Sequence, residues 1–215
     1  MSLMADCFNR NKCDKGDDGH PIGHKYYKVY EPRMEPFKDE PIKILEIGIW
    51  KGNSIAAFHD YFTEAELYGV DVFTRLDPKT VDVLQWDRVK WIKHDSTKPT
   101  VADKIKERWG DIKFDFIIDD GLHTPAANLK TFKNLFSFLK EGGSYFIEDV
   151  YALHDFTLKE SQHPWIVKHA DRYNPVVHQM LLEWIESKGE VQYHDLRIRN
   201  THSFGLDSYI IEIVK

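Results

Sequence analysis

Cysteine is scarce in this sequence, which has only Cys7 and Cys13, both in a polar N-terminal stretch. Two cysteines cannot form a framework of disulfides, and no Cys-x-x-Cys spacing is present. These absences exclude a disulfide-stapled scaffold and a cysteine-ligated metal site. They predict two reduced thiols in a cytoplasmic protein.

Long apolar runs and basic runs are also missing. No stretch reaches the roughly 20 apolar residues of a membrane span, and the N-terminus lacks the apolar segment of a signal peptide. No run of lysine and arginine exceeds two residues, and the net charge at pH 7 is −6. We therefore expect neither a membrane nor a nucleic acid as a partner.

Aromatic residues, in contrast, are plentiful, with 13 Phe, 10 Tyr and 6 Trp among 215 residues. So much bulk argues against a disordered chain and fits one domain with a full core. The first 40 residues are polar and rich in turns. A short helix is expected around 25–30, and Pro32 and Pro36 are expected to interrupt any longer one.

Strand-like and helix-like segments alternate after this region. Buried strands are expected at 43–48, 67–72, 89–95, 114–120 and 144–149, with helices at 54–61, 78–85, 101–109 and 126–139. A mostly helical stretch at 163–189 precedes two final strands at 191–198 and 208–214, expected to form an antiparallel pair. The pattern predicts an α/β fold with a doubly wound, Rossmann-like sheet of seven mostly parallel strands.

The expected parallel strands all end in glycine or in acidic residues. Open sheets of this kind bind ligands at the carboxyl ends of their strands. The first strand leads into a turn that contains Gly48 and Gly52, and glycine lets a ligand approach the backbone closely. The spacing lacks the middle glycine of the dinucleotide fingerprint, so this turn alone does not select a cofactor.

Two acidic residues lie at the ends of the second and third expected strands, where a nucleoside would bind. Asp71 ends the second strand, 23 residues after Gly48, where a carboxylate can accept both ribose hydroxyls. Asp95 ends the third strand, where it could face an adenine ring. The alternative is that both acids merely cap the structure that follows them.

Four further carboxylates end the fourth and fifth strands. Neighbouring strands lie about 5 Å apart, so Asp119, Asp120, Glu148 and Asp149 would repel one another unless a cation or protons neutralised them. A hard divalent ion such as Mg²⁺ is one answer. We expect Asp120, Glu148 and Asp149 as its ligands, and Asp119 either facing the cofactor or stabilising the loop.

His123 follows Asp120 by three residues, on the loop that leads into the next helix. An imidazole titrates near neutral pH, so it suits proton abstraction beside the metal. The alternative for His123 is an ordinary surface histidine. Tyr26, Tyr27 and Tyr30 are equally open between core packing and contact with a cofactor.

Several motifs together resemble a known family. They are Ile44-Leu45-Glu46-Ile47-Gly48, Ile118-Asp119-Asp120-Gly121-Leu122-His123, Ile147-Glu148-Asp149, the N-terminal Asp14-Lys15-Gly16, and the C-terminal His202-Ser203-Phe204. They are similar to class I methyltransferases of the mycinamicin and rhamnosyl-tetracenomycin type, which O-methylate sugars in natural products.

The resemblance implies a metal-assisted O-methyltransferase that uses S-adenosylmethionine and Mg²⁺. It implies His123 as general base, acting with Asp120, and a homo-oligomeric state. The cofactor contacts expected in full are Glu46, Gly48, Gly52, Ser54, Asp71, Asp95, Asp119, Lys15 and Tyr27. Residues 1–40 would form a segment that covers the cofactor, and residues 41–215 the domain that binds it.

The acceptor is expected to be a sugar hydroxyl in a glycoside or saccharide. Leu122 departs from the family pattern, which has a small polar residue there, and family members often carry an additional N-terminal domain. Both departures leave the substrate open. The alternatives are a methyltransferase for a catechol-like diol, a cephalosporin-hydroxylase-like protein, and a binding module for S-adenosylmethionine without catalysis.

Overall fold

The computed structural model describes residues 2–17, 23–197 and 206–215. Its centre is a sheet whose strands are β1 (Lys43–Ile47), β2 (Glu66–Asp71), β3 (Val89–Lys93), β4 (Phe114–Asp119), β5 (Leu139–Ile147), β6 (Glu190–Asp195) and β7 (Tyr209–Val214). The seven strands lie in the order β3-β2-β1-β4-β5-β7-β6. The first five of these are parallel, and β7 runs antiparallel to both β5 and β6. The predicted fold class is confirmed.

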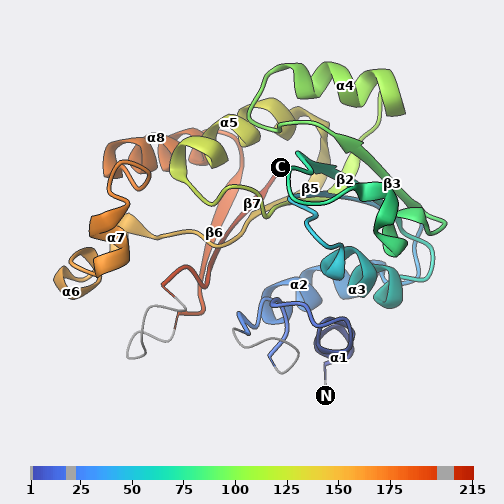
Figure 1. The fold of residues 1–215 in the computed structure, drawn as a ribbon, viewed down its shortest axis with the longest axis horizontal. Helices are drawn as coiled ribbons and strands as arrows, with labels where there is room; N and C mark the ends of the chain where they lie inside the picture. Colours follow the sequence, from blue (N-terminus) through green and yellow to red (C-terminus); the bar gives the residue numbers. More distant parts are fainter. Residues whose placement is uncertain (1, 18–22, 198–205) are drawn as a thin grey trace.

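Helices cover both faces of this sheet. They are α1 (Leu3–Arg10), α2 (Tyr27–Met34), α3 (Asn53–Tyr61), α4 (Thr100–Trp109), α5 (Pro125–Leu135), α6 (Leu158–Ser161), α7 (Pro164–Lys168) and α8 (Pro175–Glu186). Figure 1 shows α1, α2 and α3 on one side of the sheet and α4, α5 and α8 on the other. Each side has its own apolar core, as expected when strands bury both of their faces.

The first 40 residues are part of this architecture. Phe8 of α1 and Tyr30 of α2 pack edge to face against Phe58 of α3 and Phe146 of β5. These four rings are fully or almost fully buried within one core. The N-terminal helices therefore form a layer of the domain.

Several predicted elements differ from the observed ones at the N-terminal side. The helix at Leu3–Arg10 was not predicted, although the Ser2 hydroxyl accepts a hydrogen bond from Ala5 N–H as a normal N-cap does. Pro32 lies inside α2, contrary to expectation. It is the sixth residue of an eight-residue helix, so the helix ends two residues later. The predicted helix at 78–85 is a pair of 3-10 turns, Pro78–Thr80 and Asp82–Gln85.

The predicted helix at 126–139 was too long. It ends at Leu135, and after a 3-10 turn the chain is already in β5 at Leu139. Gly142 and Gly143 lie within β5 instead of stopping the helix, because their backbones exchange hydrogen bonds with Lys215. The predicted stretch at 163–189 contains two main helices, since Asn174 caps a new helix at Pro175.

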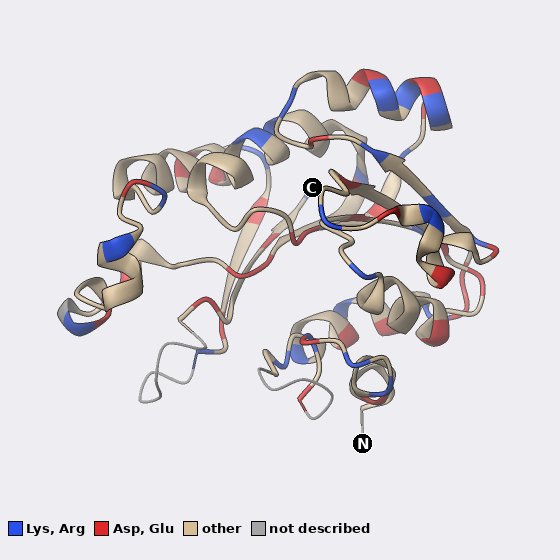
Figure 2. Ribbon diagram, in the orientation of Figure 1, with Lys and Arg blue, Asp and Glu red and all other residues tan. Residues whose placement is uncertain are grey.

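Charge is distributed without a dominant basic area in the orientation of Figure 2. Lys and Arg alternate with Asp and Glu along α4, while α5 and α8 carry few charges on the visible side. Among the described residues, no helix is both long and apolar enough to cross a bilayer.

Candidate active site

The strand order reverses between β1 and β4, and the carboxyl ends of these two strands open into a cleft. Three cavities of about 350, 440 and 270 Å³ adjoin there, and Gly48 lines all three. Gly48 has φ +87°, and a Cβ atom at this position would overlap the carbonyl oxygen of Asp120. Only glycine can therefore let the β1 turn pass beside the loop after β4.

Asp71 and Asp95 stand at the ends of β2 and β3, and both line the 270 Å³ cavity. The Asp71 carboxylate accepts hydrogen bonds from Trp50 N–H at 2.9 Å and Phe73 N–H at 2.6 Å. Asp95 accepts from the N–H and hydroxyl of Thr97 through a single oxygen. Both acids thus cap the loops that follow them, which was the alternative to a cofactor contact. An ionised carboxylate nevertheless has lone pairs left to accept hydrogen bonds from a ligand.

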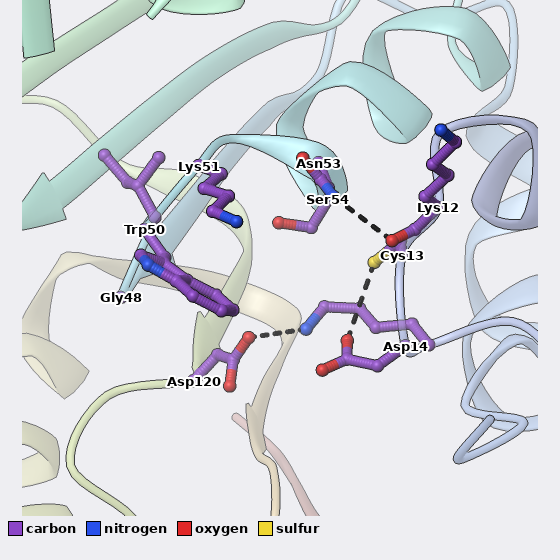
Figure 3. Close-up of a pocket in the computed structure, with 11 residues that line it drawn as sticks. Lys12, Cys13, Asp14, Gly48, Trp50, Lys51, Asn53, Ser54 and Asp120 are labelled. Carbon is purple, nitrogen blue, oxygen red and sulfur yellow. Dashed lines mark hydrogen bonds and ion pairs between the residues drawn. The ribbon is translucent and has the colours of Figure 1, made fainter. Parts of the chain in front are cut away.

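Figure 3 shows the 350 Å³ cavity, where Ser54 of α3 and the segment Lys12–Asp14 face the β1 turn across the space. Glu46 is completely buried beside this cavity. Its two carboxylate oxygens have no hydrogen-bond partner among the described residues. Burial raises the pKa of Glu46 to about 8, although the nearby Lys15 ammonium and the Ser54 hydroxyl oppose the change. A buried acid without a well-formed hydrogen bond points to a ligand group that supplies one.

Lys15 reaches the acidic strand ends from the N-terminal segment. Its Nζ lies 2.6 Å from Asp120 Oδ2, 2.6 Å from Glu148 Oε2 and 4.0 Å from Glu46 Oε1. A dashed line in Figure 3 marks the contact with Asp120. Burial lowers the pKa of Lys15, but Asp120 and Glu148 outweigh that effect and raise it well above its usual value. The side chain is therefore a buried ammonium ion.

Two tyrosines of the N-terminal segment hold the remaining acid oxygens. Tyr30 donates its hydroxyl to Glu148 Oε1, so both oxygens of Glu148 are engaged. Tyr26 donates to Asp149 Oδ1 at 2.5 Å. Sequence reasoning left these tyrosines open between core and cofactor. Their rings lie in the core while their hydroxyls support the acids.

Asp120, His123 and Asp149 converge on one point. His123 Nε2 lies 3.6 Å from Asp120 Oδ1 and 3.8 Å from Asp149 Oδ2. One ligand atom from each residue falls within 4.8 Å of the others, a grouping that could hold a metal ion. Of the predicted ligands, the structure brings Asp120 and Asp149 together with His123. It directs Glu148 to Lys15 and Tyr30 instead.

Backbone strain is concentrated at the same place. Trp50, Phe73, His123 and Asp149 all have φ between +44° and +53°, a range that side chains with a Cβ rarely adopt. All four line the 440 Å³ cavity. Each such residue costs on the order of 1–3 kcal/mol, and clustering of such strain is typical of functional sites.

Three other predicted cofactor contacts have structural roles beside the cleft: Asp119, Tyr27 and Gly52. Asp119 is buried beneath the loop and accepts a hydrogen bond from Asn128 of α5 at 3.3 Å. This favours the loop-stabilising role over the cofactor contact. Tyr27 donates its hydroxyl to Asp17, whereas its neighbour Tyr26 reaches the site. Gly52, at φ +80°, begins α3 behind the turn, where a Cβ would meet Val83. The segment His202-Ser203-Phe204 lies outside the described residues.

Sequence reasoning did not identify the residues at the outer rim of the 440 Å³ cavity. Arg75 follows β2 and Arg172 precedes α8, and both line this cavity together with His123 and Asp149. Neither arginine belongs to a motif, so the sequence offered no signal for them.

The comparisons with known proteins agree with this geometry. Residues 45–150 match the family described as a methyltransferase domain. Over 135 residues the chain is 30% identical to mycinamicin VI 2''-O-methyltransferase of Micromonospora griseorubida, covering 60% of this chain and 32% of that protein. Over 134 residues it is 30% identical to a rhamnosyl tetracenomycin-C 2'-O-methyltransferase of Streptomyces olivaceus, covering 59% and 33%.

Solved structures give the same fold. The MycE methyltransferase in complex with Mg, S-adenosylhomocysteine and mycinamycin VI aligns with a TM-score of 0.67 at 21% identity, over 99% of this chain and 54% of that one. Fibrillarin of Aeropyrum pernix with bound S-adenosyl-L-methionine aligns with a TM-score of 0.57 at 19% identity, over 82% and 67%. The resemblance predicted from the sequence is confirmed. The chain spans about a third of the length of the curated relatives it matches.

Proposed function

We propose that this chain, whose residues 45–150 match a methyltransferase domain, transfers a methyl group from S-adenosylmethionine to a hydroxyl of a saccharide or glycoside, assisted by a divalent metal ion. The observation that carries the proposal is that the cofactor-type turn at Gly48 and the cluster of Asp120, His123 and Asp149 open into the same cleft. The names of the relatives, which include methylation of mycinamicin VI and of a rhamnosyl tetracenomycin, support this reaction class.

The cleft fits the cofactor part by part. The 270 Å³ cavity between Asp71 and Asp95 suits the nucleoside, with Asp71 accepting the ribose hydroxyls and Asp95 facing the adenine. The 350 Å³ cavity beside Ser54 suits the amino-acid end. The cationic α-amino group would supply the donor that Glu46 lacks. When bound, the cofactor supplies an electrophilic methyl group.

The segment Lys12–Lys15 lines the amino-acid end of this cleft from the N-terminal side. This position supports the proposed division of the chain, in which residues 1–40 cover the cofactor and residues 41–215 bind it. The support comes from Asp14 and Lys15, not from Tyr27, whose hydroxyl is bonded to Asp17.

The free oxygens beside His123 fit a divalent cation. Carboxylates are the donors that Mg²⁺ prefers, and Asp120 and Asp149 would hold the ion with His123 at its border. A bound ion lowers the pKa of a hydroxyl that approaches it. Glu148 would support these ligands through Lys15 and Tyr30 instead of binding the ion itself.

In this proposal His123 removes the proton from the acceptor hydroxyl. Burial lowers the pKa of His123, but Asp149 and Asp120 outweigh it and raise the value above normal, which increases the basicity of the imidazole. Trp50 and Leu122 flank the 440 Å³ cavity and are 55% and 60% exposed. Such surfaces suit the apolar face of a sugar ring.

The test is a calorimetric titration with S-adenosylhomocysteine, in Mg²⁺ and again in EDTA, followed by methyl transfer to saccharide and catechol acceptors. We expect micromolar cofactor binding in both conditions and transfer to a saccharide only with metal. Cofactor binding without any methyl transfer would favour a binding module without catalysis. Methyl transfer to the catechol alone would favour a methyltransferase for catechol-like diols. Absence of cofactor binding would overturn the proposal. The homo-oligomeric state and the cytoplasmic location stay predictions.

A further inference from the structure

Lys15 places a fixed positive charge among the acids that are expected to attract a metal ion. Its side chain is only 2% exposed, and its Nζ contacts Asp120 and Glu148 at the same short distance of 2.6 Å. An ammonium ion with two such partners is strongly held, because a buried charge is costly unless it is paired. Lys15 therefore already supplies part of the positive charge that the acidic strand ends require.

The backbone around Lys15 fixes this arrangement. The carbonyl of Lys15 accepts a hydrogen bond from Tyr27 N–H, that of Asp14 from His24 N–H, and that of Gly16 from Lys25 N–H. The segment that carries Lys15 is thus clamped to the start of α2. Lys15 is aimed at the acids by the fold, unlike a surface lysine that reaches an acid by chance.

Lys15 and a metal ion would both draw on the carboxylate of Asp120. Lys15 takes one oxygen of Asp120, and the other oxygen faces His123 and Asp149. The ammonium also takes one oxygen of Glu148, while Tyr30 takes the other. An ion bound at Asp120 would lie within a few ångströms of the ammonium and would be repelled by it.

We propose that Lys15 is a resident counter-ion that competes with a divalent cation for the negative charge of Asp120, and so keeps the metal affinity of the site low. The inference rests on the proposed metal site. Binding is reciprocal, so a metal ion that weakens the hold on Lys15 also loosens the segment around Asp14 and Lys15 that lines the cofactor cavity. Metal and cofactor binding would be coupled through this one side chain.

The first experiment measures the binding of Mn²⁺ to the cofactor-free protein by electron paramagnetic resonance. Removing the charge in Lys15→Met should tighten binding by about tenfold or more, while Lys15→Arg, which keeps the charge, should stay within about threefold of wild type. Lys28→Met is the matched control, because Lys28 is an exposed lysine on α2, whereas Lys15 is buried. It should bind as wild type does.

The second experiment uses only the wild-type chain, so it does not depend on folding of a variant. Lysine acetylation is followed by mass spectrometry at increasing Mg²⁺. Lys15 should be protected without metal and become several-fold more reactive at saturation, whereas Lys28 should not change.

Equal Mn²⁺ affinity of wild type and Lys15→Met, or weaker binding by Lys15→Met, would overturn the competition while leaving the metal site intact. Labelling of Lys15 that does not respond to Mg²⁺ would overturn it as well. Absence of metal binding in every variant would overturn both the inference and the metal site of the proposed function, although cofactor binding would still be open to measurement.

Discussion

Replacing Glu46 with glutamine should stabilise the cofactor-free protein and at the same time weaken cofactor binding. Glu46 is fully buried, its oxygens have no hydrogen-bond partner among the described residues, and burial raises its pKa from 4.5 to about 8. The folded state therefore holds a proton that the unfolded state releases between these two values. Stability falls as the pH rises through this window, and a neutral amide removes that dependence.

The size of the effect follows from the pKa values. The difference between 4.5 and about 8 corresponds to about 5 kcal/mol above pH 8 and about 3 kcal/mol at pH 7. For a chain of this length, about 3 kcal/mol raises the melting temperature by roughly 6–12 °C. The gain should fall to about 1 kcal/mol at pH 5. The lost charge-assisted contact with the α-amino group should weaken binding of S-adenosylhomocysteine by about tenfold or more.

The assay is thermal unfolding of wild type and Glu46→Gln from pH 5 to 9, with calorimetric titration at pH 7. Glu212→Gln is the matched control. Glu212 is equally buried, but contacts from His194, Arg33 and Ser144 outweigh the effect of burial and lower its pKa. Its substitution should destabilise the protein at pH 7, and the loss should fade as the pH falls. A melting-temperature change in Glu46→Gln that is negative or independent of pH would refute the reasoning.

Three further predictions concern the cleft. Gly48→Ala should destabilise the fold by more than about 2 kcal/mol and abolish cofactor binding, since a Cβ there overlaps Asp120 and φ is positive; urea unfolding and calorimetry measure the two effects, and a stable variant that binds would contradict this. Asp71→Asn should weaken S-adenosylhomocysteine binding by about tenfold or more, because its NH2 group would face the N–H of either Trp50 or Phe73, which now bond to different carboxylate oxygens. His123→Ala should lower methyl transfer by about 10²–10⁴-fold with little change in cofactor affinity; unchanged transfer to an identified acceptor would show that His123 is not the base.

The sheet and the location of the cleft could be predicted because they depend on local patterns. A strand such as Phe114–Asp119 is buried along most of its length, and alternation with helices implies parallel strands whose carboxyl ends meet. Asp120, His123 and Asp149 come together for this reason alone. The structure of residues 78–85 was harder to predict, because the polar and apolar residues of the two 3-10 turns follow a pattern that also fits a surface α-helix.

The N-terminal half of the site could not be predicted in the same way. Lys15 meets Asp120 and Glu148 across 105 and 133 residues of sequence. A lysine in a polar, turn-rich stretch is normally exposed, and nothing local shows that this one is buried. The three tyrosines near 26–30 posed a similar problem. Which of them points at the acids depends on how α2 is rotated, and a shift of one residue separates Tyr26, which reaches Asp149, from Tyr27, which does not.

The acids themselves show where a sequence argument must stop. Four carboxylates at adjacent strand ends require neutralisation, and from the sequence a metal ion was one way to provide it. The structure adds other groups at the same place, namely the ammonium of Lys15 and the hydroxyls of Tyr26 and Tyr30. Counting carboxylates therefore predicts how much positive charge a site needs, but not which group supplies it. A site that is partly neutralised from within should bind a metal ion only weakly until a substrate hydroxyl adds its own oxygen.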